Sequence, residues 1–473
     1  MKQQQEGDII DSSPLSRELV GEFSYHFSHN NFTDAGKIAL AITQRSPEEP
    51  IGWKMLGAVL AQIGRLDESL VTTELAARLA PNDAEAHDNL GAVQLQLGMA
   101  TEAVVSHEKA IALQPNNAVS YCNLGNALRA QGKLKAAEEN FKNSISLAPG
   151  RAETHYNLAG LLRDLGRLEQ AECLYTKTIE LAPENASAVL GRWEVRFDRE
   201  DFDNALKDAE SHNTDAFRAC ALETLFALGR DDEVQSRLIA QEITNSRNLR
   251  ISAFSSFFSA QTRRKVPNHF CENPMELIYF SNISSHVKEP TKFISELTKE
   301  LSNIKVIWEP SGKSTKGGFQ TPEGTNLFKD PSGNIQKLND LVRLEVDNYV
   351  KIFKDQTCGF IQDWPPEANF SAWCVSLQPQ GYQKPHIHPE GWLSGVIYLK
   401  VTPRREGNEG AIEFGLSGSR YSSPDLPTVI HKPAPGDVVL FPSSLHHKTI
   451  PFTTETERVI VSFDLIPSRS SVE

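Results

Sequence analysis

The 473-residue sequence lacks several features that would assign it to a broad class. No apolar run approaches the roughly 18 residues of a membrane-spanning helix, so no such helix is expected. The polar, acidic segment Met1–Ser13 lacks the basic and apolar regions of a secretory signal. The six cysteines form no Cys-x-x-Cys pair, so neither a thiolate zinc site nor a redox dithiol is expected. Scattered cysteines without a signal predict a reducing, cytoplasmic location.

Positive charge is also in short supply. The chain has 48 lysines and arginines against 61 aspartates and glutamates, a net charge of −13. This balance argues against a nucleic acid as the main partner, because binding to phosphates needs an excess of basic groups. The hydrophobic content of 39% is ordinary for a folded protein. The length suggests about three domains' worth of sequence.

What the first half of the chain contains is an internal repeat. Proline recurs at a constant interval, at Pro47, Pro81, Pro115, Pro149 and Pro183. In the same frame, small residues fill two further columns. These columns hold Ser69, Ala103, Ala137 and Ala171, and then Ala76, Ala110, Ser144 and Thr178. A fixed period of this kind indicates stacked supersecondary units that share one core.

Each unit has the pattern of two amphipathic helices joined by a short turn, such as Ile63–Arg65 or Leu165–Arg167. Small residues would let the paired helices approach closely, and the proline would end the second helix. The pattern resembles the tetratricopeptide repeat family. The resemblance implies an all-α solenoid over 14–265, with clear repeats at 50–183 and degenerate caps on either side.

An asparagine precedes the recurring leucine in three successive units, at Asn89, Asn123 and Asn157. In tetratricopeptide proteins such as the O-linked N-acetylglucosamine transferases, an asparagine ladder holds the backbone of an extended peptide. An amide side chain can donate to a peptide carbonyl and accept from a peptide N–H. The resemblance therefore implies a protein or peptide partner in the solenoid groove, although solvated asparagines are an equally simple explanation.

Beyond about residue 270 the repeat ends and the pattern changes. Helices are predicted at Pro290–Leu301 and Ile335–Ile352, with a loop rich in glycine, serine and threonine at Ser311–Thr325 between them. Short strands separated by turn residues are predicted at 371–377, 393–401, 437–441 and 458–463. This spacing favours a sandwich or jelly roll.

Histidines in this β region have the spacing of metal ligands. Residues i and i+2 of a strand point to one face, so His386 and His388 could converge on one ion, and so could His388 and Glu390. A third ligand from a distant strand, such as His447, would complete a facial set. Two nitrogens and a carboxylate in that arrangement suit non-haem Fe(II).

From about 310 to 467 the sequence resembles the 2-oxoglutarate/Fe(II) oxygenases of the double-stranded β-helix superfamily. The matching strings are HxHP…LSGVxYL, PGDxxxFPSxLxH and ERxxxSF, together with Gly317–Thr321 and Asn326–Phe328. The resemblance implies that 266–473 is a jelly-roll domain with flanking helices. The whole chain would then be a multidomain α + β protein that begins with the all-α solenoid.

The resemblance implies that His386 and His447, rather than His446, are two of the iron ligands. The superfamily usually has an acid two residues after the first histidine, where this chain has His388. The ligand set is therefore either His386, His388 and His447, or a set that uses His388 with Glu390. The three-histidine set is favoured here, because the HxHP string itself matches.

The resemblance also implies roles for residues around the co-substrate. Arg458 follows His447 at the spacing of the arginine that binds the distal carboxylate of 2-oxoglutarate. Tyr398 and Ser462 could add hydroxyl groups to the same carboxylate. His431 is interpreted as structural. Trp373 and Trp392 are interpreted as core or pocket-wall residues.

The resulting hypothesis is an Fe(II)- and 2-oxoglutarate-dependent dioxygenase that hydroxylates a protein or peptide recruited by the solenoid. Dioxygen is its other substrate. The alternative is an interaction scaffold whose β domain binds metal without turnover. A further alternative is a three-histidine dioxygenase that does not use 2-oxoglutarate.

Overall fold

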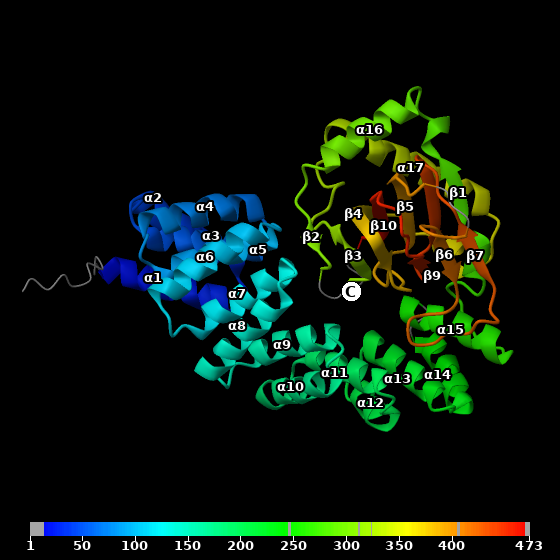
Figure 1. Cartoon of the computed structure of the whole chain (residues 1–473), viewed down its shortest axis with the longest axis horizontal. Coiled ribbons are helices and arrows are strands. Elements are labelled where there is room, and N and C mark those ends of the chain that lie inside the picture. Colours follow the sequence, from blue (N-terminus) through cyan, green and yellow to red (C-terminus); the bar gives the residue numbers. More distant parts are fainter. Residues whose placement is uncertain (1–13, 245–246, 311–312, 323, 404–406, 469–473) are drawn as a thin grey trace, which may run out of the picture. The chain divides into compact units, whose positions relative to one another are not determined.

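The computed structural model describes residues 14–244, 247–310, 313–322, 324–403 and 407–468 (Figure 1). The expectation about a signal in Met1–Ser13 lies outside these residues. The chain divides into two compact units, Met1–Gly150 and Arg151–Glu473. The second unit therefore contains repeat helices as well as the β domain. The boundary between 265 and 266 stays a prediction. No helix among the described residues is long and apolar enough to cross a membrane.

The first unit consists of paired helices. Its described helices are α1 (Pro14–Ser28), α2 (Phe32–Arg45), α3 (Pro50–Gln62), α4 (Leu66–Leu79), α5 (Ala84–Gln96), α6 (Ala100–Leu113), α7 (Ala118–Ala130) and α8 (Leu134–Leu147). Helices α3, α5 and α7 begin at the same interval as the recurring prolines, which confirms the repeat frame. Asp83 and Asn117 cap α5 and α7 by accepting from backbone N–H groups of the first turn.

Close helix packing explains the small residues of the repeat. Ser69, Ala103 and Ala137 are fully buried. A Cβ atom on Gly57, Gly91 or Gly125 would lie 2.6 Å from a side chain of the second helix of the same repeat. A larger residue in that column would therefore push the two helices apart, so the sequence pattern follows directly from the packing distance.

The second unit continues the helical pattern before the β domain begins. Its repeat-region helices are α9 (Ala152–Asp164), α10 (Leu168–Leu181), α11 (Ala186–Asp198), α12 (Phe202–Ala209), α13 (Asp215–Ala227), α14 (Asp231–Thr244) and α15 (Leu249–Thr262). Helix α11 begins one full repeat period after α9, so the frame extends one unit past the clear repeats. The glycine of the α9–α10 turn, Gly166, has a φ of 73°, a left-handed conformation that favours glycine.

The β domain has two antiparallel sheets, in agreement with the predicted jelly roll. One sheet has the order β1-β8-β5-β10-β4-β3-β2 and the other β7-β6-β9. Their bounds are β1 (Tyr279–Asn282), β2 (Ile307–Trp308), β3 (Thr315–Gln320), β4 (Ala368–Gln383), β5 (Leu393–Lys400), β6 (Ile412–Gly415), β7 (Thr428–His431), β8 (Asp437–Pro442), β9 (His446–Thr449) and β10 (Arg458–Pro467). Strands β8, β5, β10 and β4, which the sequence predicts, are consecutive neighbours in the larger sheet.

The larger sheet buries both of its faces. One face packs on helices α16 (Pro290–Leu301) and α17 (Gly333–Phe353) through residues such as Val461 and Phe463 of β10. The other face packs on the smaller sheet through residues such as Ile460 of β10 and Phe414 of β6. Alternate residues of β10 therefore face the helices and the interior between the sheets, as the period of a strand requires.

The predicted loop at Ser311–Thr325 is wrong in its middle, because Thr315–Gln320 forms strand β3 on β4. Ser311, Gly312 and Glu323 lie outside the described residues. Gly317 and Gly318 make this strand difficult to predict from the sequence, since glycine is rare in strands. A Cβ atom on Gly318 would lie 2.7 Å from the backbone oxygen of Ser376, so glycine lets β3 approach β4 at this irregular point of the pairing.

Candidate metal and co-substrate site

Backbone pairing brings two of the predicted ligands together. His386 follows the end of β4, and His447 belongs to β9. The two residues form an isolated antiparallel bridge, in which each backbone N–H donates to the carbonyl of the other at 3.1 Å. Their imidazole rings consequently lie side by side, with ring centroids 4.2 Å apart.

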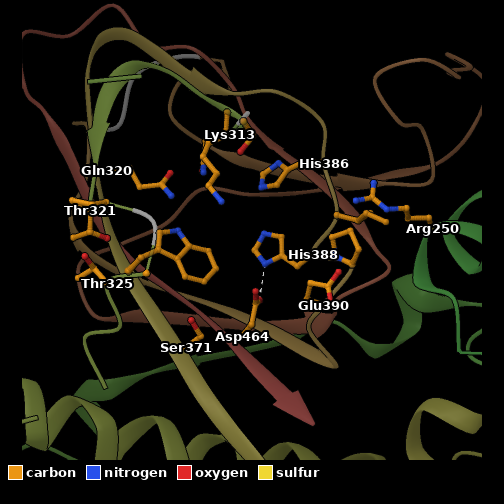
Figure 2. A pocket seen from close by; sticks show the side chains of 17 residues that line it. Arg250, Lys313, Gln320, Thr321, Thr325, Ser371, His386, His388, Glu390 and Asp464 are labelled. Atoms are coloured by element: carbon orange, nitrogen blue, oxygen red, sulfur yellow. Dashed lines mark hydrogen bonds and ion pairs between the residues drawn. The ribbon is translucent and has the colours of Figure 1, made fainter. Parts of the chain in front are cut away.

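The third histidine is held by a carboxylate. His388 lies with its ring 5.2 Å from the His386 ring and 5.0 Å from the His447 ring. Its Nδ1 lies 2.6 Å from Oδ1 of Asp464 on β10 (Figure 2). The hydroxyl of Ser394 on β5 donates to the same carboxylate oxygen at 2.7 Å. Asp464 of β10, held in turn by Ser394 of the neighbouring strand β5, therefore orients the His388 ring.

Each of the three rings has one nitrogen engaged by an acceptor. Nδ1 of His386 lies 2.7 Å from the Lys384 carbonyl, and Nδ1 of His447 lies 3.2 Å from the Leu445 carbonyl. Since these oxygens only accept, each Nδ1 carries the proton and each Nε2 keeps a free electron pair. Ligand nitrogens of all three residues lie within 4.8 Å of one another, a spacing that one metal ion can bridge.

The surroundings keep the imidazoles of His386 and His447 neutral. Burial, with the nearby His388 ring as the second cause, lowers the pKa of His386 to about 3. Burial and the rings of His386 and His388 place the pKa of His447 well below its usual range. A neutral imidazole is the form that binds a metal, so the site is ready for a cation near neutral pH.

A cavity of about 560 Å³ opens over His386 and His388. Trp373 of β4 forms one wall, 5.5 Å from the His388 ring. Arg250 of α15 also lines this cavity (Figure 2). Glu390 is exposed at the edge of the cavity and does not belong to the group of possible ligands.

A neighbouring cavity of about 290 Å³ extends from His386 to the repeat helices. It is lined by Glu223 of α13 and by Arg250, and also by Arg420 and His446 of the β domain. Burial raises the pKa of Glu223 to about 7, although Arg420 and Arg250 attract its negative form. Helices α13 and α15 thus contribute charged groups next to the histidines.

Arg458 is buried in the interior between the two sheets. It is 1% exposed, and its Nη1 donates to Oγ1 of Thr449 at 2.7 Å. Thr449 lies two residues after His447 on β9, so Arg458 is tied to the strand that carries this histidine. No carboxylate among the described residues pairs with Arg458, and its Nε has no hydrogen-bond partner. Burial lowers the pKa of the guanidinium.

Tyr398 faces Arg458 from the adjacent strand β5. The guanidinium carbon lies 5.1 Å from the centre of the Tyr398 ring, and the buried hydroxyl of Tyr398 has no hydrogen-bond partner among the described residues. Ser462 lies on the same face of β10 as Arg458 and Asp464, and it is 4% exposed. The structure brings Tyr398 to Arg458, and among the described residues it shows no contact that links Ser462 to either of them.

The other histidines of the β domain have structural partners. His446 points away from His447, and its Nε2 lies 3.2 Å from the hydroxyl of Tyr421. Nε2 of His431 lies 3.0 Å from Asp437. Trp392 is a core residue whose Nε1 donates to the carbonyl of Phe360 at 3.0 Å.

The asparagines of the predicted ladder occupy equivalent places in their helices. Asn89 on α5 and Asn123 on α7 belong to the first unit, and Asn157 on α9 belongs to the second. All three side chains are half-buried. The ladder stays a prediction.

Sequence analysis missed Asp464 and Thr449. The strand period indicates only the face on which each residue lies, because Asp464 lies six residues after Arg458 and Thr449 lies two after His447. Even spacing on a strand places each of them on the face of its functional neighbour.

Models of known protein families match separate regions of the chain. Two tetratricopeptide repeat models match residues 20–84 and 116–184. A model described as "Putative 2OG-Fe(II) oxygenase" matches residues 371–464. The chain joins tetratricopeptide repeats to a 2-oxoglutarate/Fe(II) oxygenase-family domain. The match to this oxygenase-family domain includes His386, His388, His447 and Arg458. No curated protein sequence matches the chain.

Several solved structures are similar to part of this chain. PilF of Pseudomonas aeruginosa is 19% identical over 46% of this chain and 97% of its own, with a TM-score of 0.38. A tetratricopeptide repeat protein of Parabacteroides merdae is 16% identical over 52% of this chain and 98% of its own, with a TM-score of 0.37. MamA of Desulfovibrio magneticus is 20% identical over 36% and 96%, with a TM-score of 0.31.

Proposed function

We propose that this protein is an Fe(II)- and 2-oxoglutarate-dependent dioxygenase that hydroxylates a protein or peptide substrate. The observation that carries the proposal is the convergence of His386, His388 and His447, whose ligand nitrogens lie within 4.8 Å of one another. Imidazole nitrogens suit iron. With dioxygen, bound Fe(II) and 2-oxoglutarate would supply an oxidative decarboxylation to succinate and carbon dioxide, coupled to hydroxylation of a C–H bond.

The donor set fits this metal even though it lacks the usual carboxylate ligand. Three neutral imidazoles leave the full charge of a divalent ion uncompensated. Asp464 lies one hydrogen bond behind His388 and supplies a negative charge at that distance. A carboxylate behind a ligating imidazole also fixes its tautomer and strengthens it as a donor.

Arg458 and Tyr398 are the groups proposed to bind the distal carboxylate of 2-oxoglutarate. A buried guanidinium without an acid partner is costly, because its charge has lost the hydration of bulk water. The free Nε of Arg458 and the free hydroxyl of Tyr398 are both donors that a carboxylate could satisfy. Ser462 shares the inner face of β10 and is proposed as a further hydroxyl donor.

The repeat helices support a protein or peptide substrate. Arg250 of α15 lines the same cavity as His386 and His388, so the end of the helical region forms part of the access to the site. Asn89, Asn123 and Asn157 are proposed to hold the backbone of an extended peptide. A groove that retains the peptide would raise its local concentration near the iron.

The test uses the purified full-length protein with Fe(II), 2-oxoglutarate and dioxygen, and it measures succinate formation and metal content. His447→Gln should abolish metal retention and lower succinate formation by about 100-fold or more, because one of three ligands is lost. His446→Gln is the matched control, since His446 is the preceding residue of β9 and points away from the site. This control should keep both properties, provided that its melting temperature is unchanged.

Other outcomes identify the alternatives. A wild-type protein that retains no divalent metal would contradict the proposal and favour the interaction scaffold. A protein that retains iron and consumes dioxygen without forming succinate would favour the 2-oxoglutarate-independent dioxygenase.

A further inference from the structure

Two cysteines far apart in the sequence meet on the β-domain side of the second unit. Cys271 and Cys358 both line one cavity of about 290 Å³. Cys271 is buried, whereas Cys358 is half-buried. The two cysteines do not belong to a Cys-x-x-Cys motif, so their spacing in the sequence did not predict a dithiol.

The backbone holds the two thiols in place. The N–H of Gly359 donates to the carbonyl of His269 at 2.9 Å, and the N–H of Phe360 donates to the carbonyl of Phe270 at 2.7 Å. These bonds join the residues next to Cys271 to the residues next to Cys358.

The side chain of Asn268 fixes the Cys271 backbone from the other direction. Its Nδ2 donates to the Cys271 carbonyl at 2.8 Å, and its Oδ1 accepts from the Cys271 N–H at 3.3 Å. Asn268 is itself buried, and it bonds to Ser252 and Ser256 of α15. The position of Cys271 is therefore determined by a connected polar network rather than by a loop alone.

The two sulfurs differ in their chemistry. The thiol of Cys271 hydrogen-bonds to Cys358 and lowers the pKa of Cys358 to about 6, with help from the backbone N–H groups of Ile361 and Phe360. The same hydrogen bond and burial raise the pKa of Cys271. Cys358 is thus the thiolate of the pair near neutral pH, and Cys271 is the proton donor.

Three other cysteines provide a comparison. Burial raises the pKa of Cys220 and raises the pKa of Cys374 to about 12. Cys173 of α10 is exposed and lies in the repeat region. It provides a reference for an accessible thiol in the same chain.

We propose that Cys358 and Cys271 form an oxidisable pair that reacts with hydrogen peroxide and closes to a disulfide. In the first step the Cys358 sulfur forms a bond to one peroxide oxygen and the O–O bond breaks, giving a sulfenic acid and, after protonation, water. In the second step the Cys271 sulfur attacks the Cys358 sulfur. The S–O bond breaks, and the Cys271 proton leaves with the hydroxide as a second water. Each sulfur loses one electron, and the two electrons reduce the peroxide.

The first measurement follows the pH dependence of reactivity. The reduced full-length protein is alkylated with iodoacetamide between about pH 5 and 9, and each site is quantified by peptide mass spectrometry. Cys358 should reach half of its maximal rate near pH 6, because its thiolate forms there. The exposed Cys173 provides the reference profile, and the profile of Cys358 should differ from it. Parallel profiles at the two cysteines would overturn the proposal.

The second measurement uses stoichiometric hydrogen peroxide and peptide mapping without reductant. The expected product is one intramolecular link between Cys271 and Cys358, formed equally in wild type and in Cys173→Ser. In Cys271→Ser, Cys358 should stop at a sulfenic acid that dimedone traps. Oxidation of Cys173 before Cys358, or of Cys358 to sulfinic acid without any link in the wild type, would contradict the pair. Neither readout depends on oxygenase activity.

Discussion

Two regions of the second unit differ in how their arginines are paired. In the repeat region, Arg192 and Arg196 of α11 both bind Asp208 of α12, with N–O distances of 2.7 and 2.9 Å, and Asp208 is 4% exposed. In the β domain, Arg458 is more deeply buried and donates to the hydroxyl of Thr449.

This difference is the one that we propose between a structural charge and a charge that binds a ligand. A chain that needs a buried guanidinium for packing supplies the acid as well, since removing water from both groups is tolerable only when they are paired. Arg458 has no acid partner among the described residues, although Asp464 lies on the same strand face. Asp464 is instead bonded to His388. Asp464 is thus engaged by His388, and Arg458 is left without an acid partner among the described residues.

The largest effect on this comparison is expected at the paired arginines. Asp208→Asn should lower the free energy of unfolding by about 2–3 kcal/mol, because two guanidinium groups lose their shared carboxylate. This decrease is at the low end of the range expected for buried ion pairs, since the side chains of Arg192 and Arg196 are 17% and 16% exposed. Urea unfolding followed by circular dichroism measures it.

Arg458→Leu is the contrasting variant for the same measurement. Because no carboxylate loses a partner, its unfolding free energy should stay within about 1 kcal/mol of the wild type or rise above it. Equal destabilisation by Asp208→Asn and Arg458→Leu would remove the distinction between the two regions.

A smaller effect is expected at the acid of the metal site. Asp464→Asn keeps an oxygen near His388 but removes the charge, and it should weaken divalent metal binding by about 10- to 100-fold. Titration with Mn(II) under anaerobic conditions measures the change. Ser394→Ala is the control, because it removes one hydrogen bond to Asp464 and leaves the carboxylate. If Asp464→Asn binds the metal as tightly as the wild type does, the charge of Asp464 does not contribute to metal binding.

The repeat region could be predicted from the sequence because its contacts are local. The spacing of Gly57, Gly91 and Gly125 repeats with the helix pairs, and each glycine packs within its own unit. The period therefore appears directly in the sequence. The same period gives no information about Asp208. Its ion pairs with residues of α11 do not recur from one repeat to the next.

The site in the β domain could be predicted only in part. The histidines and Arg458 stand in recognisable strings, so their convergence was expected. The role of Asp464 depends on the pairing of β10 with β5, which places it beside Ser394, a residue far from it in the sequence. The pair Cys271 and Cys358 depends on contacts of the same kind. Such pairings come from tertiary packing, and no local spacing reveals them.

The central claim is that Arg458 holds an anion beside the three histidines. Calorimetric titration of 2-oxoglutarate into the Mn(II)-loaded, oxygen-free protein tests it most directly, with wild type and Arg458→Leu compared at equal metal occupancy. The account predicts saturable binding to the wild type and at least about 100-fold weaker binding to the variant, since a buried charge pair is lost. Equal affinity in the two proteins, or no binding to the metal-loaded wild type, would contradict it.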